Sequence, residues 1–171
     1  HRTVNPKYSS VNTRLVGIND IVTGTANSND DLIIKIDGGH ETLFVNFNRA
    51  KGINADVKGS IDKVVIIRQN SGADESRWIA EMGHGEEWKS PYTFSNSGKH
   101  LVVKNCAIFY DSETDDSKSD TAKVLVYLEG LNDVECGNVP PPPPPPSSNF
   151  DNGECQTDYT WHDSGGIAYD C

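Results

Sequence analysis

Short apolar runs separated by turn residues fill most of the chain, from Val11 to Glu129. The runs are rich in Val, Ile, Phe and Tyr, and no 3.6-residue periodicity persists for three turns. This pattern predicts an all-β domain. The expected strands are 13–18, 32–37, 42–48, 63–69, 77–81, 92–94, 100–104, 107–110 and 122–129.

Two of these runs indicate which side chains face the core. Residues 63–69 contain four consecutive aliphatic residues, which is typical of a central strand covered on both faces. In 122–129 the alternation places one apolar set on a single side, and we expect that side to be buried. The set is Ala122, Val124, Val126 and Leu128. About nine strands at this spacing favour a two-sheet β-sandwich, jelly-roll-like in its strand order, over a closed barrel.

The charge balance is acidic, with 15 Lys and Arg against 25 Asp and Glu and a net charge of −10. Such a field repels phosphate backbones, so we expect no nucleic-acid partner. No run approaches the ~18 apolar residues of a membrane helix, and we expect no membrane insertion. The chain begins with His1, which suggests a processed chain or a fragment.

The four cysteines form an even set without any C-x-x-C pair. This favours two disulfides over a zinc site, and it points to a secreted, extracellular protein. Three pairings are possible. We prefer Cys106–Cys136 and Cys155–Cys171 because these pairs respect the two segments of the chain on either side of the proline run.

The composition changes after Gly130, which divides the chain into a β domain (1–135), a proline linker (136–149) and a disulfide-bracketed tail (150–171). Consecutive prolines lack N–H donors and form a polyproline II helix rising ~3.1 Å per residue. The composition of the run is also that of an O-glycosylated stalk. The candidate glycan positions are Pro140, Pro141, Pro142, Pro143, Pro144, Pro145, Pro146, Ser147 and Ser148.

An acidic stretch offers hard oxygen ligands of the kind calcium prefers, at Asp111, Glu113, Asp115 and Asp116. Its spacing begins like an EF-hand loop, but the sixth position is Asp116 instead of Gly and the twelfth is Ala122 instead of Glu. We therefore favour a solvated acidic loop over a calcium site. No other cofactor is expected.

Four aromatic residues deserve consideration as a sugar platform, because carbohydrate-binding modules present coplanar rings on a sheet face. They are Trp78, Trp88, Tyr92 and Tyr110. Their spacing favours core or edge positions over a platform.

Catalytic motifs are incomplete throughout the chain. The stretch "EMGHGEEWK" holds a single His84 where a zinc protease needs H-E-x-x-H, so a solvated turn is favoured. The tail contains "DSGG", but a short disulfide loop cannot hold a base and an oxyanion hole around Ser164. We expect no catalytic residues and no enzyme activity.

Three stretches resemble known secreted proteins. "LFVNFNRAKGINADVKGSIDKVVIIRQ", "WIAEMGHGEEWKSPYTFSNSGKHLVVKNCAIF" and "AKVLVYL", within Thr42–Leu128, resemble the β-sandwich domain of gametolysin-like secreted algal proteins, without their protease motif. The tail "CQTDYTWHDSGGIAYDC" is similar to a cysteine-bracketed module of secreted algal and stramenopile proteins. The proline run resembles that of algal hydroxyproline-rich glycoproteins.

Together these resemblances imply a non-catalytic structural glycoprotein of an extracellular surface or matrix fibre, in which the proline run carries hydroxyproline-linked sugars. We expect self-association, with residues 1–12 as a possible arm that donates a strand to a neighbouring subunit. The alternative is a carbohydrate-binding or accessory module of a larger secreted hydrolase, with a polysaccharide as its partner.

Overall fold

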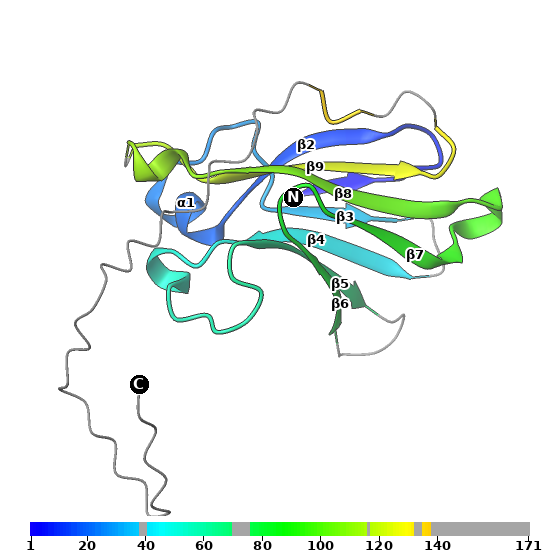
Figure 1. The fold of residues 1–171 in the computed structure, drawn as a ribbon, viewed down its shortest axis with the longest axis horizontal. Coiled ribbons are helices and arrows are strands. Elements are labelled where there is room, and N and C mark those ends of the chain that lie inside the picture. The colour runs from blue at the N-terminus through cyan, green and yellow to red at the C-terminus, as the bar shows by residue number, and fades with distance from the viewer. Residues whose placement is uncertain (38–40, 70–75, 116, 132–134, 138–171) are drawn as a thin grey trace, which may run out of the picture.

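The computed structural model describes residues 1–37, 41–69, 76–115, 117–131 and 135–137. Strands dominate this part of the chain and form two sheets (Figure 1). The finding confirms the prediction of an all-β class with two sheets. The single α-helix described is α1 (Ile18–Thr23), and three short 3-10 helices, η1 (Gly52–Asn54), η2 (Ser95–Ser97) and η3 (Asp111–Glu113), lie between strands.

The first sheet has five strands in the order β1-β3-β4-β5-β6. Its strands are β1 (Arg2–Val4), β3 (Ile33–Ile36), β4 (Thr42–Asn48), β5 (Lys63–Gln69) and β6 (Ser76–Met82). β1 pairs in parallel with β3, and the other pairs are antiparallel. β6 is therefore an edge strand of this sheet.

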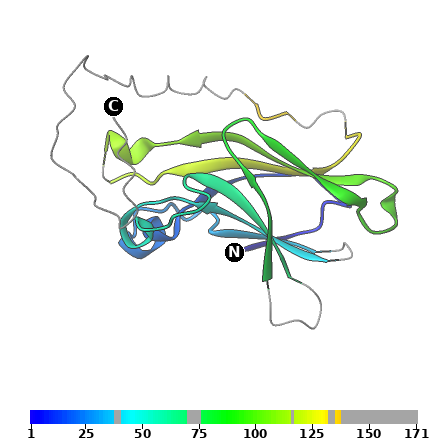
Figure 2. The same cartoon turned by 60° about the horizontal axis from the view of Figure 1, so that its bottom comes forward.

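The second sheet has four strands in the order β2-β9-β8-β7. They are β2 (Val11–Val16), β7 (Glu87–Thr93), β8 (His100–Phe109) and β9 (Thr121–Leu128), and all pairs are antiparallel. β7 is an edge strand here, and it follows β6 directly in the sequence. Figure 2, turned from the first view, shows β8 and β9 running along one side of the molecule.

One hydrophobic cluster draws its buried residues from both sheets. The side of β9 that we expected to be buried is buried, since Ala122, Val124 and Val126 are 0% exposed and Leu128 is 5% exposed. β5 lies between β4 and β6, as expected for a central strand. Only its first half is buried on both faces, at Val64, Val65 and Ile66.

The strand order differs from the jelly-roll-like order that we expected. β3 to β6 follow one another across the first sheet, and β7 to β9 do so across the second. This order follows the general tendency of strands that are consecutive in the sequence to lie side by side, whatever the length of the connection, and the chain passes from the first sheet to the second at residues 83–86. The parallel pairing of β1 with β3 is a second departure.

The N-terminal segment, which we expected as an arm available to a neighbouring subunit, pairs with its own chain. Arg2, Thr3 and Val4 lie opposite Ile34, Lys35 and Ile36 of β3. Val4 is buried in the common hydrophobic cluster. The segment thus completes one edge of the first sheet.

Two predicted strands, 100–104 and 107–110, are a single strand with a bulge. In β8, Asn105 lies opposite Val124 and Ala107 lies opposite Lys123, so Cys106 is an extra residue in the ladder. A bulge of this kind bends the strand and re-aims one side chain. It is this residue that forms the disulfide.

Candidate binding groove

A groove of about 400 Å³ opens where the two edge strands β6 and β7 meet. Both sheets contribute to it. The residues that shape it are Leu43, Arg68, Ile79, Trp88, Tyr92 and Phe94. Leu43 and Phe94 form a buried floor, at 7% and 5% exposure, whereas Tyr92 is 65% exposed. A volume of this size is typical of sites for small or elongated ligands.

The irregular backbone of β7 presents the aromatic wall of this groove. The ladder with β8 shifts register between Lys89 and Thr93, so Ser90, Pro91 and Tyr92 have no partners in it. Pro91 has no N–H to donate and is tolerated because β7 is an edge strand. The Ser90 hydroxyl donates to the Tyr92 carbonyl at 2.8 Å and accepts from the Tyr92 N–H at 3.2 Å. This local loop fixes the backbone from which the Tyr92 ring projects.

One ion pair provides the charge beside the aromatic wall. Arg68 Nη1 donates to Glu41 Oε1 at 3.1 Å, and both residues line the groove. Arg68 Nε is buried and has no hydrogen-bond partner within the described part of the chain. The groove therefore combines aromatic rings with an ion pair whose Arg68 side chain is 25% exposed.

A second concentration of charge surrounds Arg49, at the start of the stretch that follows β4. Its guanidinium donates to Asp120 Oδ2 at 2.8 Å and to Asp62 Oδ2 at 2.7 Å. Its Cζ lies 4.9 Å from the centre of the Tyr110 ring. Ser112 donates to Asp120 through both its N–H, at 2.9 Å, and its hydroxyl, at 2.7 Å.

These partners decide the protonation of the Arg49 cluster, by which we mean Arg49, Asp62, Tyr110, Ser112 and Asp120. Burial alone would raise the pKa of Asp120, but hydrogen bonds from Arg49 and Ser112 outweigh it and hold the pKa below its ordinary value. Burial also disfavours the charged form of Arg49 and would lower its pKa, but hydrogen bonds to Asp62 and Asp120 outweigh burial and raise the pKa. The cluster is therefore a mutually satisfied structural ion network.

The sequence "NRAKGIN" folds around this cluster and docks α1. Asn54 donates to Asn48 Oδ1 at 2.8 Å, and the Ile53 N–H donates to Asn19 Oδ1 at 3.4 Å. Gly52 has φ +55°, and a Cβ placed there would lie 1.8 Å from Asn19 Oδ1. This string, which lies within the first stretch that resembles the algal domain, thus has a structural role in this chain.

Asp20 lies in α1 and is 1% exposed. Burial raises the pKa of its carboxyl, an effect that a hydrogen bond from Thr25 and the charge of Lys51 reduce in part. Its Oδ2 has no hydrogen-bond partner among the described residues. It is a buried acid whose charged form is disfavoured.

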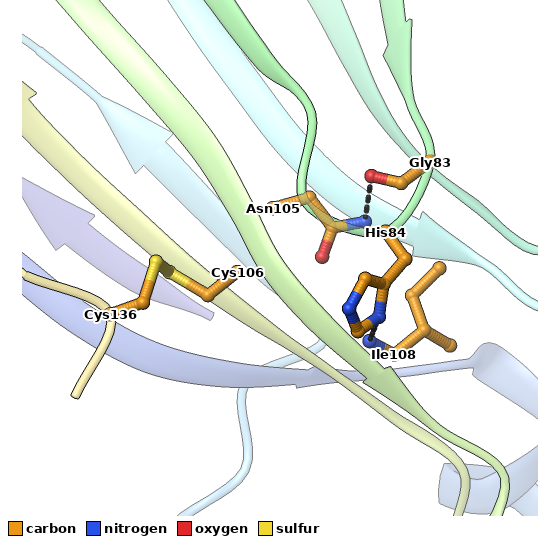
Figure 3. Close-up of a disulfide and its surroundings, with 6 residues drawn as sticks. All are labelled: Gly83, His84, Asn105, Cys106, Ile108 and Cys136. Atoms are coloured by element: carbon orange, nitrogen blue, oxygen red, sulfur yellow. Dashed lines mark hydrogen bonds between the residues drawn. A yellow bond between two sulfur atoms is a disulfide. The ribbon is translucent and has the colours of Figure 1, made fainter. Parts of the chain in front are cut away.

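The structure contains the Cys106–Cys136 disulfide that we predicted, with the two Cα atoms 5.5 Å apart (Figure 3). Figure 3 also shows Asn105 and His84 near this part of β8. Asn105 Nδ2 donates to the Gly83 carbonyl at 2.9 Å, and His84 Nδ1 accepts from the Ile108 N–H at 3.2 Å. These bonds hold residues 83–86, the centre of the "EMGHGEEWK" stretch, as the turn between β6 and β7.

The carboxylates of the acidic loop that the structure describes are Asp111, Glu113 and Asp115, and they belong to no group of three potential metal ligands. Asp115 accepts from the N–H and hydroxyl of Ser117 at 3.0 and 2.6 Å, and these bonds lower its pKa. The Glu113 side chain is 66% exposed and reaches toward Arg49. No group of three or more potential metal ligands occurs among the residues that the structure describes, and Asp116 lies outside them. The choice between a solvated loop and a calcium site stays a prediction.

The four candidate aromatic residues separate into three places. Trp88 and Tyr92 lie together in the groove, Trp78 is 59% exposed on β6, and Tyr110 packs against Arg49. The sequence did not indicate that Arg68 and Glu41 would join the groove, because they are distant in the chain. One signal was present in the sequence: a proline such as Pro91 inside a strand indicates an edge strand with an irregular ladder.

The proline run, Ser147, Ser148 and the Cys155–Cys171 pair lie outside the described residues. In the part of the chain that is described, no helix is long and apolar enough to cross a membrane. Comparisons of the chain with protein-family models, with curated proteins and with solved structures found no match.

Proposed function

We propose that this chain is a non-catalytic structural subunit of an extracellular fibre, built as a β-sandwich that carries a glycosylated polyproline rod. The observation that carries the proposal is the disulfide that fastens Cys136 to β8, four positions before Pro140. The single hydrophobic cluster shared by both sheets supports the sandwich.

The position of the disulfide is suited to holding the proline rod in a fixed direction relative to the β domain. Each proline fixes φ near −65°, so a run of seven spans roughly 22 Å as a stiff helix. A stiff segment is useful as a spacer only if its base is also fixed. The link between Cys106 and Cys136 provides this base on a strand with neighbours on both sides.

The extracellular assignment is supported by the disulfide and by the resemblances. Disulfides form and persist in oxidising compartments. The resemblance of Thr42–Leu128 to the accessory domain of gametolysin-like algal proteins, and of the proline run to hydroxyproline-rich glycoproteins, supports an algal or protist matrix or surface fibre. In this proposal Pro140–Pro146 carry the sugars.

An exposed apolar surface supports self-association. Ile18, Ile21 and Val22 of α1 are 45%, 44% and 63% exposed, and Ile53 of the adjacent η1 is 66% exposed. Contiguous apolar surface of this kind is typical of protein–protein contacts. If it binds a different surface of the next copy, the contact is heterologous and propagates into a filament.

Electron microscopy and mass spectrometry test this function together. We expect the full chain, secreted from a host that hydroxylates proline, to form filaments and to carry sugar mass on residues 140–148. A matched variant, Cys106→Ser with Cys136→Ser, keeps the rod but frees its base, and we expect its filaments to be less regular. Single particles without sugar at high protein concentration would contradict the proposal.

A second candidate function, a polysaccharide-binding module, is favoured by one observation. Trp88 and Tyr92 line the same groove, and aromatic rings are the usual platforms for sugar rings. This candidate predicts a monomer that binds an oligosaccharide such as cellohexaose through Tyr92.

A further inference from the structure

We propose that the groove between β6 and β7 binds the polyproline segment Pro140–Pro146 of a second copy of this chain. The inference rests on the proposed function, because assembly supplies the neighbouring copy. It adds what the fibre proposal leaves open, namely a specific site on one subunit for a specific segment of the next.

The chemistry of consecutive prolines sets the requirements for such a site. Each residue offers an apolar ring and a carbonyl oxygen, and none offers an N–H. A receptor must therefore provide apolar or aromatic surface and hydrogen-bond donors, and it need not provide acceptors. Known proline-rich ligands dock in aromatic-lined grooves, where their preformed helix loses little entropy on binding.

The groove meets both requirements. Trp88, Pro91 and Tyr92 supply the apolar wall, and the Tyr92 ring is held out by the Ser90 hydrogen bonds. The Arg68 side chain is 25% exposed, and among the described residues its guanidinium donates only through Nη1, so it has N–H donors left for a ligand. A ligand carbonyl can accept from one of them.

The same contacts argue against a sugar as the occupant. A sugar ring presents many hydroxyls, and each needs a donor or an acceptor when it is buried. Two polar groups of the groove are already committed, since the Ser90 hydroxyl binds the Tyr92 backbone and Glu41 is paired with Arg68 Nη1. An apolar ligand with carbonyl acceptors fits this arrangement better.

Glycosylation of the rod is compatible with docking. A polyproline II helix has three residues per turn, so one face can lie in the groove while the other two project away from it. Docking therefore requires the prolines on the groove-facing side to be free of sugar, whereas sugars on the other two faces remain outside the contact.

The test uses the full chain and the labelled synthetic peptide NVPPPPPPPSSN, which has the sequence of residues 138–149. We expect the peptide to bind and Tyr92→Ala to weaken binding about tenfold, the effect of losing one good aromatic contact. Tyr8→Ala is the matched control, because Tyr8 is 80% exposed and does not line the groove. We expect this control to bind as the unaltered chain does.

A second variant alters the rod and leaves the groove unchanged. In it Pro141, Pro143 and Pro145 are each replaced by Ser. We expect it to raise the protein concentration needed for assembly about as much as Tyr92→Ala does. The two changes combined should add little, because both remove the same contact. Mixing the two single variants should restore pairwise association in sedimentation, since one supplies an intact rod and the other an intact groove.

The outcomes separate the inference from the function on which it rests. If filaments form and Tyr92→Ala changes neither assembly nor peptide binding, the inference is wrong and the fibre function stands. If the chain stays monomeric but binds the peptide in a Tyr92-dependent manner, the fibre function fails, the second copy is ruled out as the occupant, and only the affinity of the groove for polyproline is supported. Tyr92-dependent binding of cellohexaose, without binding of the peptide, would overturn the inference in favour of a sugar site.

Discussion

The Arg49 cluster and the groove both combine charged and aromatic side chains, yet they differ in how fully those groups are satisfied. In the cluster, Arg49 binds two carboxylates and lies against Tyr110. In the groove, Tyr92 is 65% exposed and Arg68 Nε has no partner within the described chain. The cluster therefore holds the fold together, and the groove has unused capacity for binding. Substitutions in the two regions should have opposite effects on stability and binding.

The largest expected effect is on stability, from Asp120→Ala. Asp120 is fully buried, and its loss removes one of the two carboxylates that bind the Arg49 guanidinium. Breaking a buried pair in this way costs about 3 kcal/mol or more in the free energy of unfolding. Urea unfolding followed by fluorescence measures the change.

Lys89→Ala is the control for this prediction, because the Lys89–Glu129 pair is about half exposed. We expect it to leave the unfolding midpoint almost unchanged. Equal effects of the two substitutions would show that the Arg49 cluster is not a structural centre.

Gly52→Ala should cost about 1–3 kcal/mol, because the backbone there is left-handed and the new methyl group would meet Asn19. Gly85→Ala is the matched control, since Gly85 also has a positive φ, +77°, but has no atom within 4 Å of the added carbon. The difference between the two variants in thermal unfolding isolates the contact between η1 and α1. If the two variants unfold at the same temperature, α1 shifts to accommodate the methyl group and the contact does not contribute to stability.

Asp20 should affect the pH dependence of stability. Its pKa is raised in the folded chain, so its contribution is fully present below the unfolded pKa and is lost as the pH rises through the folded value. Asp20→Asn stays neutral, and we expect its stability relative to the unaltered chain to increase as the pH rises above the ordinary carboxyl pKa of about 3.9.

The pH dependence of stability should change in the opposite direction for Asp120→Asn. The pKa of Asp120 is lowered by folding, so its contribution is present above the unfolded pKa and is lost as the pH falls. We expect this variant to lose most stability near neutral pH and least in acid. If the stability of the two variants, relative to the unaltered chain, changed with pH in the same direction, the pKa shift of at least one of the two carboxyls would be wrong.

The smallest expected change in stability comes from Tyr92→Ala. Its ring projects from an edge strand and is mostly exposed, so we expect a change within about 0.5 kcal/mol in the free energy of unfolding. The same variant should show the weakened peptide binding described above. A large loss of stability would place Tyr92 with the structural residues, and the contrast between the two regions would disappear.

The sequence predicted the central strands well because their apolar patterns are long. The bounds of β4 and β5 match the predicted 42–48 and 63–69. α1 was missed because six residues are too few to show helical periodicity. β1 was missed because three residues carry no alternation, and its position depends on pairing with β3.

The sites were less predictable because they depend on contacts between distant residues. The Cys106–Cys136 pairing followed from the division of the chain into segments, and the structure contains it. Trp88 and Tyr92 were recognised as candidates, but their association with Arg68 requires two sheets to meet at one edge. The bulge at Cys106 likewise depends on the register with β9.

The cystine has a mechanical consequence for any load applied along the proline run. Without it, a pull from the C-terminal side would act on the end of β9 and could unzip its hydrogen bonds one after another. With it, the load passes from Cys136 into the middle of β8, whose ladders on both sides must shear together. Reducing agents should therefore weaken the chain under tension far more than their effect at rest would suggest.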